Sequence, residues 1–306
     1  MTNRVATADG SSHAPAASGT SLAVAAVVAA AALWSLSGVF VKILYGEGGT
    51  GAHPLAITVY RSAAGGLMLL PWAAAHARTL HVAHPVWPAL SIASFALMSA
   101  TFVAATAHTA AANAIILQYT SPIWVFLLGA PLLGERVRRH DWGVLALAIL
   151  GLAIIYFGQS SDRGGLNLAL ISGFGYGCVT LFIRKLRAVH PLVVTTLNAL
   201  GSAVALSPLL IMQDAWRVSA AQLGGIIGMG FVQFILPYVL FAWALRRLSA
   251  ARVALLTLLE CVLNPVWTWL FLHEQPPAAA LIGAPIVLAA IALKSLLDAR
   301  REPVPA

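Results

Sequence analysis

Residues 251–274 read ARVALLTLLECVLNPVWTWLFLHE, an apolar run long enough to cross a bilayer that carries Glu260 and Asn264-Pro265 near its middle. A related stretch, residues 112–135, reads ANAIILQYTSPIWVFLLGAPLLGE and also has a polar interruption at its centre. A shift of 139 residues aligns Glu135 with Glu274 and Ser121 with Glu260. An apolar helix with polar residues at its midpoint, present twice, indicates a transport path built from two related halves.

The composition is that of an integral membrane protein. Of the 306 residues, 60% are hydrophobic and 9% are charged, and the mean hydropathy is +0.86. Soluble domains have about 25% charged residues. A spanning helix needs about 20 apolar residues, and the apolar runs are far longer than the about 10 residues of a barrel strand. The sequence therefore predicts an all-α membrane protein with ten transmembrane helices.

The ten predicted helices fall into two groups of five. Their expected boundaries are 22–45, 55–75, 86–107, 112–133, 141–158, 165–186, 191–212, 219–244, 250–272 and 277–297. We expect residues 1–21 to form a disordered cytoplasmic tail, because they are polar and rich in small residues. Residues 22–158 and 165–297 are predicted to be the two five-helix repeats, and 298–306 a second cytoplasmic tail.

Basic residues predict the orientation of the chain. Of the 18 Lys and Arg, 14 fall in the two tails or in loops on the same side as the tails, and only Arg163 and Arg217 fall in loops on the other side. Lys and Arg concentrate on the cytoplasmic side of membrane proteins. The pattern predicts a multi-pass protein of a bacterial inner membrane with both termini in the cytoplasm. The net charge of +8 reflects this topology, and nucleic acid is not an expected partner.

A second repeated motif relates the two groups of helices. His53-Pro54-Leu55 recurs as His190-Pro191-Leu192 after a shift of 137 residues, which also aligns Pro71 with Pro208. Because each group has an odd number of spans, the two groups would cross the membrane in opposite senses. Inverted repeats of this kind are typical of secondary transporters.

Two five-helix halves, each with a P-x-(about 12)-E signature such as Pro122 to Glu135, resemble the drug/metabolite transporter superfamily and within it the EamA-domain family. The chain is most similar to its bacterial amino-acid exporters, including exporters of aromatic amino acids. The resemblance implies a basket of helices around a central cavity lined by spans 1, 3, 4, 6, 8 and 9. Spans 5 and 10 would be peripheral. The second copy commonly has Glu-Pro where this chain has Glu260-Cys261, so we expect its kink one turn further along, at Pro265.

Glu260 is the strongest candidate for a functional side chain. A carboxylate at mid-bilayer is costly and faces a polar interior, where it could bind a substrate ammonium group, exchange a proton or fix helix packing. Lys42 could meet a substrate carboxylate or extend to the outer interface. For Arg61, inside the second span, we expect a structural role in bonding helix-end carbonyls.

Prolines inside three spans predict kinks that free backbone carbonyls. Pro122 would free the carbonyl of Gln118, Pro237 that of Gln233, and Pro265 completes the set. The predicted substrate-binding residues share the middle of the lining spans, with Lys42 nearer one end; they are Glu260, Lys42, Trp34, Ser37, Gln118, Tyr119, Tyr176, Thr180, Gln233, Tyr238 and Asn264.

These features predict a secondary transporter that exports small organic metabolites, amino acids above all, by alternating access. The alternatives are an antiporter of phosphorylated metabolites or nucleotide sugars, or a small drug exporter. An intramembrane enzyme is not expected, because no His or Asp lies at a span centre, and no nucleotide-binding motif is present. The loop histidines His76, His81 and His84 lack a carboxylate, so we expect no metal and no cofactor. The expected oligomeric state is a monomer or a homodimer.

Overall fold

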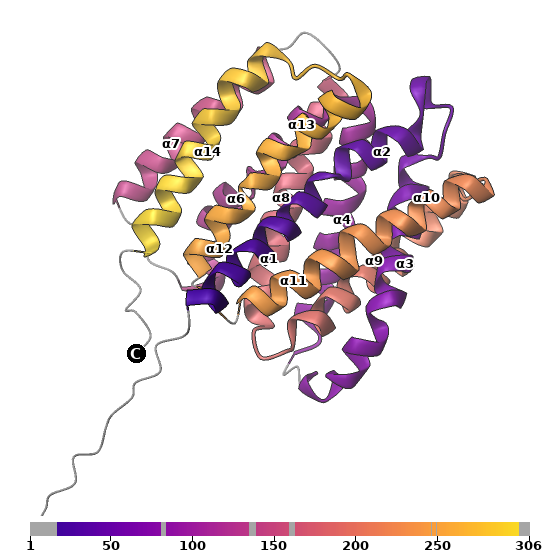
Figure 1. Cartoon of the computed structure of the whole chain (residues 1–306), viewed down its shortest axis with the longest axis horizontal. Helices are drawn as coiled ribbons and strands as arrows, with labels where there is room; N and C mark the ends of the chain where they lie inside the picture. The colour runs from indigo at the N-terminus through magenta and orange to yellow at the C-terminus, as the bar shows by residue number, and fades with distance from the viewer. Residues whose placement is uncertain are drawn as a thin grey trace, which may run out of the picture.

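The computed structural model describes residues 17–80, 84–134, 139–158, 163–245, 247–248 and 250–299, and within these ranges it contains helices and no strand (Figure 1). Its α-helices are α1 (Ala17–Ser35), α2 (Ser37–Tyr45), α3 (Pro54–Ala75), α4 (Val86–His108), α5 (Ala111–Gln118), α6 (Ser121–Leu133), α7 (Arg139–Phe157), α8 (Arg163–Lys185), α9 (Pro191–Met212), α10 (Ala220–Gly230), α11 (Leu236–Leu245), α12 (Ala250–Thr257), α13 (Leu259–Leu272) and α14 (Ala278–Ala299).

Eight of the described helices, counting interrupted ones as single runs, are long and apolar enough to cross a membrane. The apolar part of α7 is shorter, and α3, which carries the buried polar residues Thr58, Arg61 and Ser62, is not among the eight. The chain is thus an all-helical, multi-pass membrane protein. Helix α1 begins at Ala17, so residues 17–21, predicted to belong to the tail, are helical. The rest of that tail, like Glu135, lies outside the described residues.

The two His-Pro-Leu motifs begin two helices in the same way. His53 is the N-cap of α3 and His190 is the N-cap of α9, and each ring accepts a hydrogen bond from the backbone N–H two residues on, at 3.2 Å and 3.3 Å. A proline follows each histidine at the first helical position, where its missing N–H costs nothing. Both helices are 22 residues long, and they pack against each other.

Four membrane-crossing runs are interrupted near their middles. Helix α1 gives way to α2 at Leu36, α5 to α6 at Tyr119 and Thr120, and α12 to α13 at Leu258. Between α10 and α11 the chain makes a π-helical turn, Phe231–Ile235. Such interruptions leave main-chain groups without helical partners, which a membrane protein tolerates only where protein or a polar cavity covers them.

The interruption between α12 and α13 lies at Leu258, about two turns before Pro265, which sits inside α13. The kink expected at Pro265 stays a prediction. A shift of 139 residues places Tyr119 on Leu258, so the break falls at the same register in both copies. Leu258 and Cys261 each donate their N–H to a carbonyl three residues back, the tight pattern that ends a helix. Local turn geometry, rather than proline, thus sets this break.

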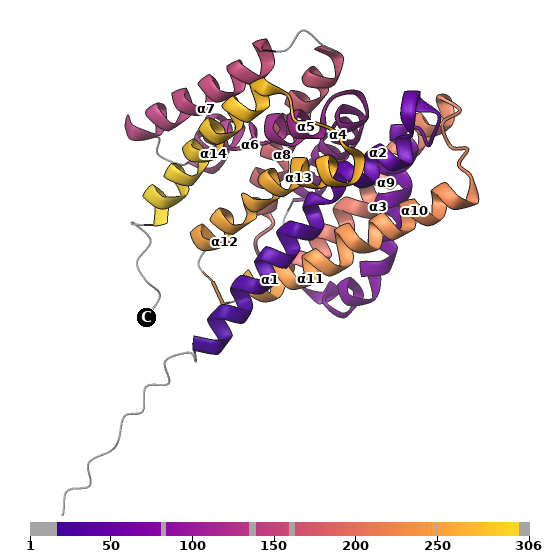
Figure 2. The same cartoon turned by 45° about the horizontal axis from the view of Figure 1, so that its top comes forward.

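The helices are arranged with α7 and α14 at one edge and the interrupted helices between them and α3 (Figures 1 and 2). Helix α7 packs along α14, α4 along α8, and α1 along α11. The peripheral position expected for spans 5 and 10 agrees with that of α7 and α14. Their backbones approach closely where Gly151 faces Gly283.

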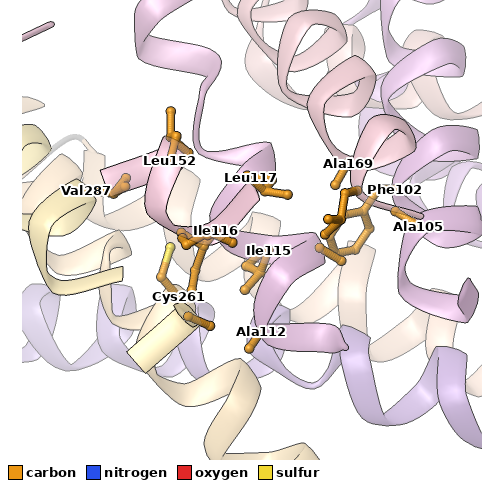
Figure 3. Packing of buried hydrophobic residues seen from close by; sticks show 14 residues of the cluster. Phe102, Ala105, Ala112, Ile115, Ile116, Leu117, Leu152, Ala169, Cys261 and Val287 are labelled. Atoms are coloured by element: carbon orange, nitrogen blue, oxygen red, sulfur yellow. The ribbon is translucent and has the colours of Figure 1, made fainter. Parts of the chain in front are cut away.

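The largest buried cluster surrounds α5, all of whose residues are buried. In Figure 3, Ile115, Ile116 and Leu117 of α5 lie between Phe102 and Ala169 on one side and Cys261 and Val287 on the other. This cluster joins helices from both halves of the chain. It holds the interruption after Gln118 in a fixed place.

Two glycines of α8 leave room for the interrupted run α5–α6 to pack directly against α8. A Cβ atom at Gly173 would collide with the Thr120 side chain and the carbonyls of Leu117 and Gln118, and one at Gly177 would meet Trp124 at 2.6 Å. The main chain at the break therefore lies directly against α8. The carbonyl of Gln118, which Pro122 was predicted to free, lies next to Gly173 of α8.

Candidate functional site

Glu260 lies in the first turn of α13, directly after the break at Leu258. The hydroxyl of Tyr119, from the break between α5 and α6, donates to Oε2 of Glu260 at 3.2 Å and lies 3.5 Å from the carbonyl oxygen of Thr257. Tyr176 of α8 packs edge-on against Tyr119, with ring centroids 6.5 Å apart. The carboxyl group therefore sits where two interrupted helices meet, with phenol groups around it.

Trp34 and Tyr238 form an aromatic cluster beside this carboxyl group. The ring of Trp34 meets the edges of Tyr238 at 5.2 Å and Phe241 at 5.3 Å. Its indole N–H donates to the main-chain carbonyl of Gln233 at 3.1 Å. Pro237, four residues after Gln233, cannot donate to that carbonyl. The Gln233 carbonyl therefore accepts a hydrogen bond from the indole of α1.

The two groups of residues are neighbours. Tyr238 packs on Trp34 and stacks on Phe234, over which Arg61 lies. Trp267 of α13, the helix that carries Glu260, donates its indole N–H to Ser35, next to Trp34, at 2.8 Å. The structure thus gathers six predicted residues from α1, the α5–α6 break, α8, the π-helical turn, α11 and α13 into one region: Trp34, Tyr119, Tyr176, Gln233, Tyr238 and Glu260.

Four further predicted residues bond to protein groups close by. The Asn264 amide donates to Ser37 at 3.0 Å, which links α13 to α2, while its oxygen is buried without a donor. The Gln118 amide donates to Ser172 of α8 at 2.8 Å. Thr180 bonds the carbonyl of Tyr176 within its own helix. The Asn264–Ser37 and Gln118–Ser172 bonds both join the two halves.

Lys42 lies apart from this region, in the last turn of α2. Its ammonium group pairs with Oε2 of Glu274 at 2.9 Å and donates to the carbonyl of Thr109 at 2.9 Å. The other carboxylate oxygen of Glu274 accepts from the N–H of Ala111, the first residue of α5, at 2.7 Å. In this structure Lys42, which was predicted to bind substrate, forms an ion pair with Glu274 that links the two halves.

The hydrogen-bond partners of Arg61 differ from those predicted from the sequence. Instead of helix-end carbonyls, its guanidinium bonds the side chains of Gln233 at 3.2 Å and Ser99 at 2.6 Å. An arginine inside an apolar span was the available signal. Ser99 and Ser172 gave no such signal, because a serine is a common packing residue in membrane helices.

A pocket of about 330 Å³ opens between α5, α13 and α14, lined almost wholly by apolar atoms. Ile116, Cys261 and Pro265 belong to its wall. None of Glu260, Tyr119 or Trp34 lines it, so it is distinct from the predicted central cavity. Elsewhere in the described part of the chain, no group of three His, Cys, Asp or Glu side chains is placed to hold a metal ion; His81 lies outside that part.

Comparison with known proteins assigns this arrangement to a family. The EamA-like transporter family matches the chain twice, over residues 21–157 and 163–296. A solved crystal structure superposes with a TM-score of 0.62 at 18% identity and covers 92% of this chain and 99% of that chain. That likeness concerns the fold alone.

Several relatives are named as transporters. An uncharacterized transporter of Archaeoglobus fulgidus is 29% identical over 273 residues, which cover 87% of this chain and 94% of the relative. The pseudopaline exporter CntI of Pseudomonas aeruginosa is 32% identical over 203 residues, 65% of this chain and 71% of the relative. A probable amino-acid metabolite efflux pump of Salmonella typhimurium is 25% identical over 214 residues, 65% and 72% of the two chains. The chain belongs to the EamA-like transporter family, and it is a membrane transporter rather than an enzyme.

Proposed function

We propose that this protein exports amino acids, including neutral and aromatic ones, across the bacterial inner membrane by alternating access. The observation that best supports this proposal is the position of the Glu260 carboxyl group, at mid-span between two interrupted helices and beside the Tyr119 hydroxyl. A carboxylate so placed can hold an ammonium group, and the rings of Trp34, Tyr176 and Tyr238 offer an aromatic surface next to it. The names of relatives such as the amino-acid metabolite efflux pump support this substrate class.

The transport mechanism rests on ten spans in two inverted five-helix repeats, 22–158 and 165–297, around a central basket-like cavity. The packing supports an internal two-fold relation. A two-fold axis would exchange span 3 with span 8 and span 6 with span 1. Because span 3 (α4) packs on span 6 (α8), span 8 should pack on span 1, and α11 of span 8 does pack on α1 of span 1. The pairs α3 with α9 and α7 with α14 map onto themselves. Rocking of the halves about the breaks would expose Glu260 to one side and then to the other.

We place both termini in the cytoplasm, because 14 of the 18 Lys and Arg lie on their side. The unit that transports is a monomer or a homodimer. An antiporter of phosphorylated metabolites is less well supported, because Lys42, one of the two cations inside spans, is paired with Glu274.

The test is uptake of radiolabelled amino acids into liposomes that contain the purified protein, with and without a pH gradient and at matched protein density. Saturable uptake of a neutral or aromatic amino acid is the expected result. Protein-free liposomes and liposomes with the Glu260→Ala variant are the controls. Exchange of a phosphate ester or an organic cation, with no uptake of any amino acid, would leave the fold assignment standing and overturn the substrate class.

A further inference from the structure

Arg61 is a buried cation in the middle of the helix bundle. It is the eighth residue of α3, about 10 Å along the helix axis from Pro54, and its exposed fraction is 7%. Charged side chains inside membrane spans are costly to insert, and they commonly mark substrate or ion pathways. The position of Arg61 therefore calls for a compensating partner.

The partners that surround Arg61 are neutral. Nη1 donates to Oε1 of Gln233, Nη2 donates to Oγ of Ser99, and the guanidinium lies 5.7 Å from the ring centroid of Phe234. Its Nε is buried without an acceptor, and no carboxylate within the described ranges forms an ion pair with it. Buried charges are normally paired. The positive charge of Arg61 is thus left uncompensated by the described chain.

Arg61 is joined to the region that holds Glu260. Gln233, which accepts from the guanidinium, also accepts from the Trp34 indole through its main-chain carbonyl, and its amide lies 3.4 Å from the carbonyl oxygen of Trp34. Phe234, over which the guanidinium lies, stacks on Tyr238, and Tyr238 packs on Trp34. Trp267 of α13, the helix that holds Glu260, donates to Ser35, next to Trp34. The cation, the carboxyl group and the aromatic rings therefore border the same part of the bundle.

We propose that Arg61 binds the carboxylate of the transported solute, while Glu260 holds the ammonium group of the same molecule; this rests on the function proposed above. A zwitterion has the two charges that the site lacks, one opposite each buried group. A guanidinium fits a carboxylate in a bidentate manner, and Nε, which has no acceptor, supplies the additional donor. Gln233 and Ser99 hold the guanidinium in place and stay neutral, so its charge remains available. Arg61 takes the role that sequence reasoning gave to Lys42.

The experiment measures counterflow of radiolabelled phenylalanine in liposomes and its inhibition by phenylalanine and by phenylalaninamide, which keeps the ammonium group and lacks the carboxylate. Wild-type protein should bind phenylalanine more tightly than phenylalaninamide. Arg61→Gln should weaken the affinity for phenylalanine by about 10- to 100-fold, the range for loss of a charge-assisted hydrogen bond, and leave the affinity for the amide unchanged. Arg217→Gln, the same substitution at an exposed arginine outside the site, is the matched control and should retain the preference.

Arg61→Lys provides a second measurement where Arg61→Gln does not fold. A lysine keeps the charge and loses the fork of donors, so the affinity for phenylalanine should fall and that for the amide should not. Equal losses for the two ligands, or no loss in either variant, would overturn the assignment of Arg61 and leave the exporter function standing. Wild-type liposomes that take up no amino acid would overturn both proposals.

Discussion

At the scale of single residues, the carboxyl group of Glu260 is the group for which we propose a change of charge during transport. It touches the Tyr119 hydroxyl, and the described ion pairs include none to it. A proton that binds Glu260 would compete with a substrate ammonium group for the same oxygen atoms. Proton-coupled exchange would use this competition.

Glu260→Gln tests this role, because glutamine keeps the size and the acceptor and cannot release a proton. We expect amino-acid exchange by the variant to lose its pH dependence, as measured by initial rates in liposomes over a range of pH. Tyr119→Phe, which removes the donor and keeps the titrating group, should retain a pH-dependent rate. A Glu260→Gln variant with unchanged rate and pH profile would make Glu260 a packing residue.

Many residues of the site could be predicted from the sequence, because prolines and ionisable residues inside apolar runs are easily recognised there. Pro237 predicted the freed carbonyl of Gln233, but nothing in the sequence identified Trp34 as its partner. Lys42 could be recognised as unusual, whereas its pairing with Glu274 depends on how residues 232 positions apart meet in space. Residue chemistry was predictable, and the choice of partners was not.

At the scale of elements, contact between α8 and the interrupted run α5–α6 depends on glycine. Gly173→Ala should lower stability by about 1–3 kcal/mol, the usual cost of overpacking, because a methyl group there meets Thr120 and the carbonyls at the break. Gly224→Ala is the control, since a Cβ at Gly224 of α10 meets nothing within 4 Å. It should gain about 0.5–1 kcal/mol of helix stability. Thermal unfolding of the purified variants in detergent measures both, and equal effects would argue against close packing at the break.

The start of α3 should respond to pH through His53. Burial, and secondarily the neighbouring His108, lower the pKa of His53 below its ordinary value of 6.5. The unfolded chain then takes up the proton more readily than the folded one, so stability is fully present above pH 6.5 and falls as the pH drops from there toward the lowered pKa. Protonation also removes the ring nitrogen that accepts from Leu55. Thermal unfolding of His53→Ser at several pH values should show a weaker decline on acidification than wild type, and parallel curves would contradict the role of this cap.

Element boundaries show where sequence reasoning reached its limit. The starts of α3 and α9 follow from the His-Pro-Leu motif, whose ring and proline act within two residues of the helix end. The break at Leu258 could not be read from the sequence, because it depends on local turn geometry that many residues adopt, whereas a proline such as Pro265 is a recognisable cause of kinks. A glycine such as Gly173 can be recognised in the sequence, but the main-chain atoms that it meets follow only from the fold.

At the scale of the whole molecule, the pair Lys42–Glu274 links the two halves at one end of the bundle. Both side chains are about four-fifths buried, with exposed fractions of 21% and 22%, and Glu274 also caps α5. A link of this kind must open when that end of the transport path opens. It therefore favours the closed arrangement of this end.

Lys42→Met and Glu274→Gln should each shift the protein toward the arrangement open at this end. The double variant should lose less stability than the sum of the losses in the two single variants. The difference, a coupling energy of about 0.5–3 kcal/mol, arises because each single change leaves one group unpaired. Modification of a cysteine placed at Thr109, measured with a water-soluble thiol reagent after replacement of Cys178 and Cys261, reports the opening. Additive effects on stability together with unchanged modification would mean that the pair does not close this end.

The hydroxyl of Tyr119 has a single proton and two acceptors within reach, the carboxylate of Glu260 and the main-chain carbonyl of Thr257. It can serve only one of them fully at a time. When Glu260 gains a proton or a cationic ligand, its oxygen atoms become weaker acceptors, and we expect the Tyr119 hydroxyl to turn its hydrogen bond toward the Thr257 carbonyl at the helix break. A change in the charge of one side chain would then alter the bonding of the main chain where the two halves meet.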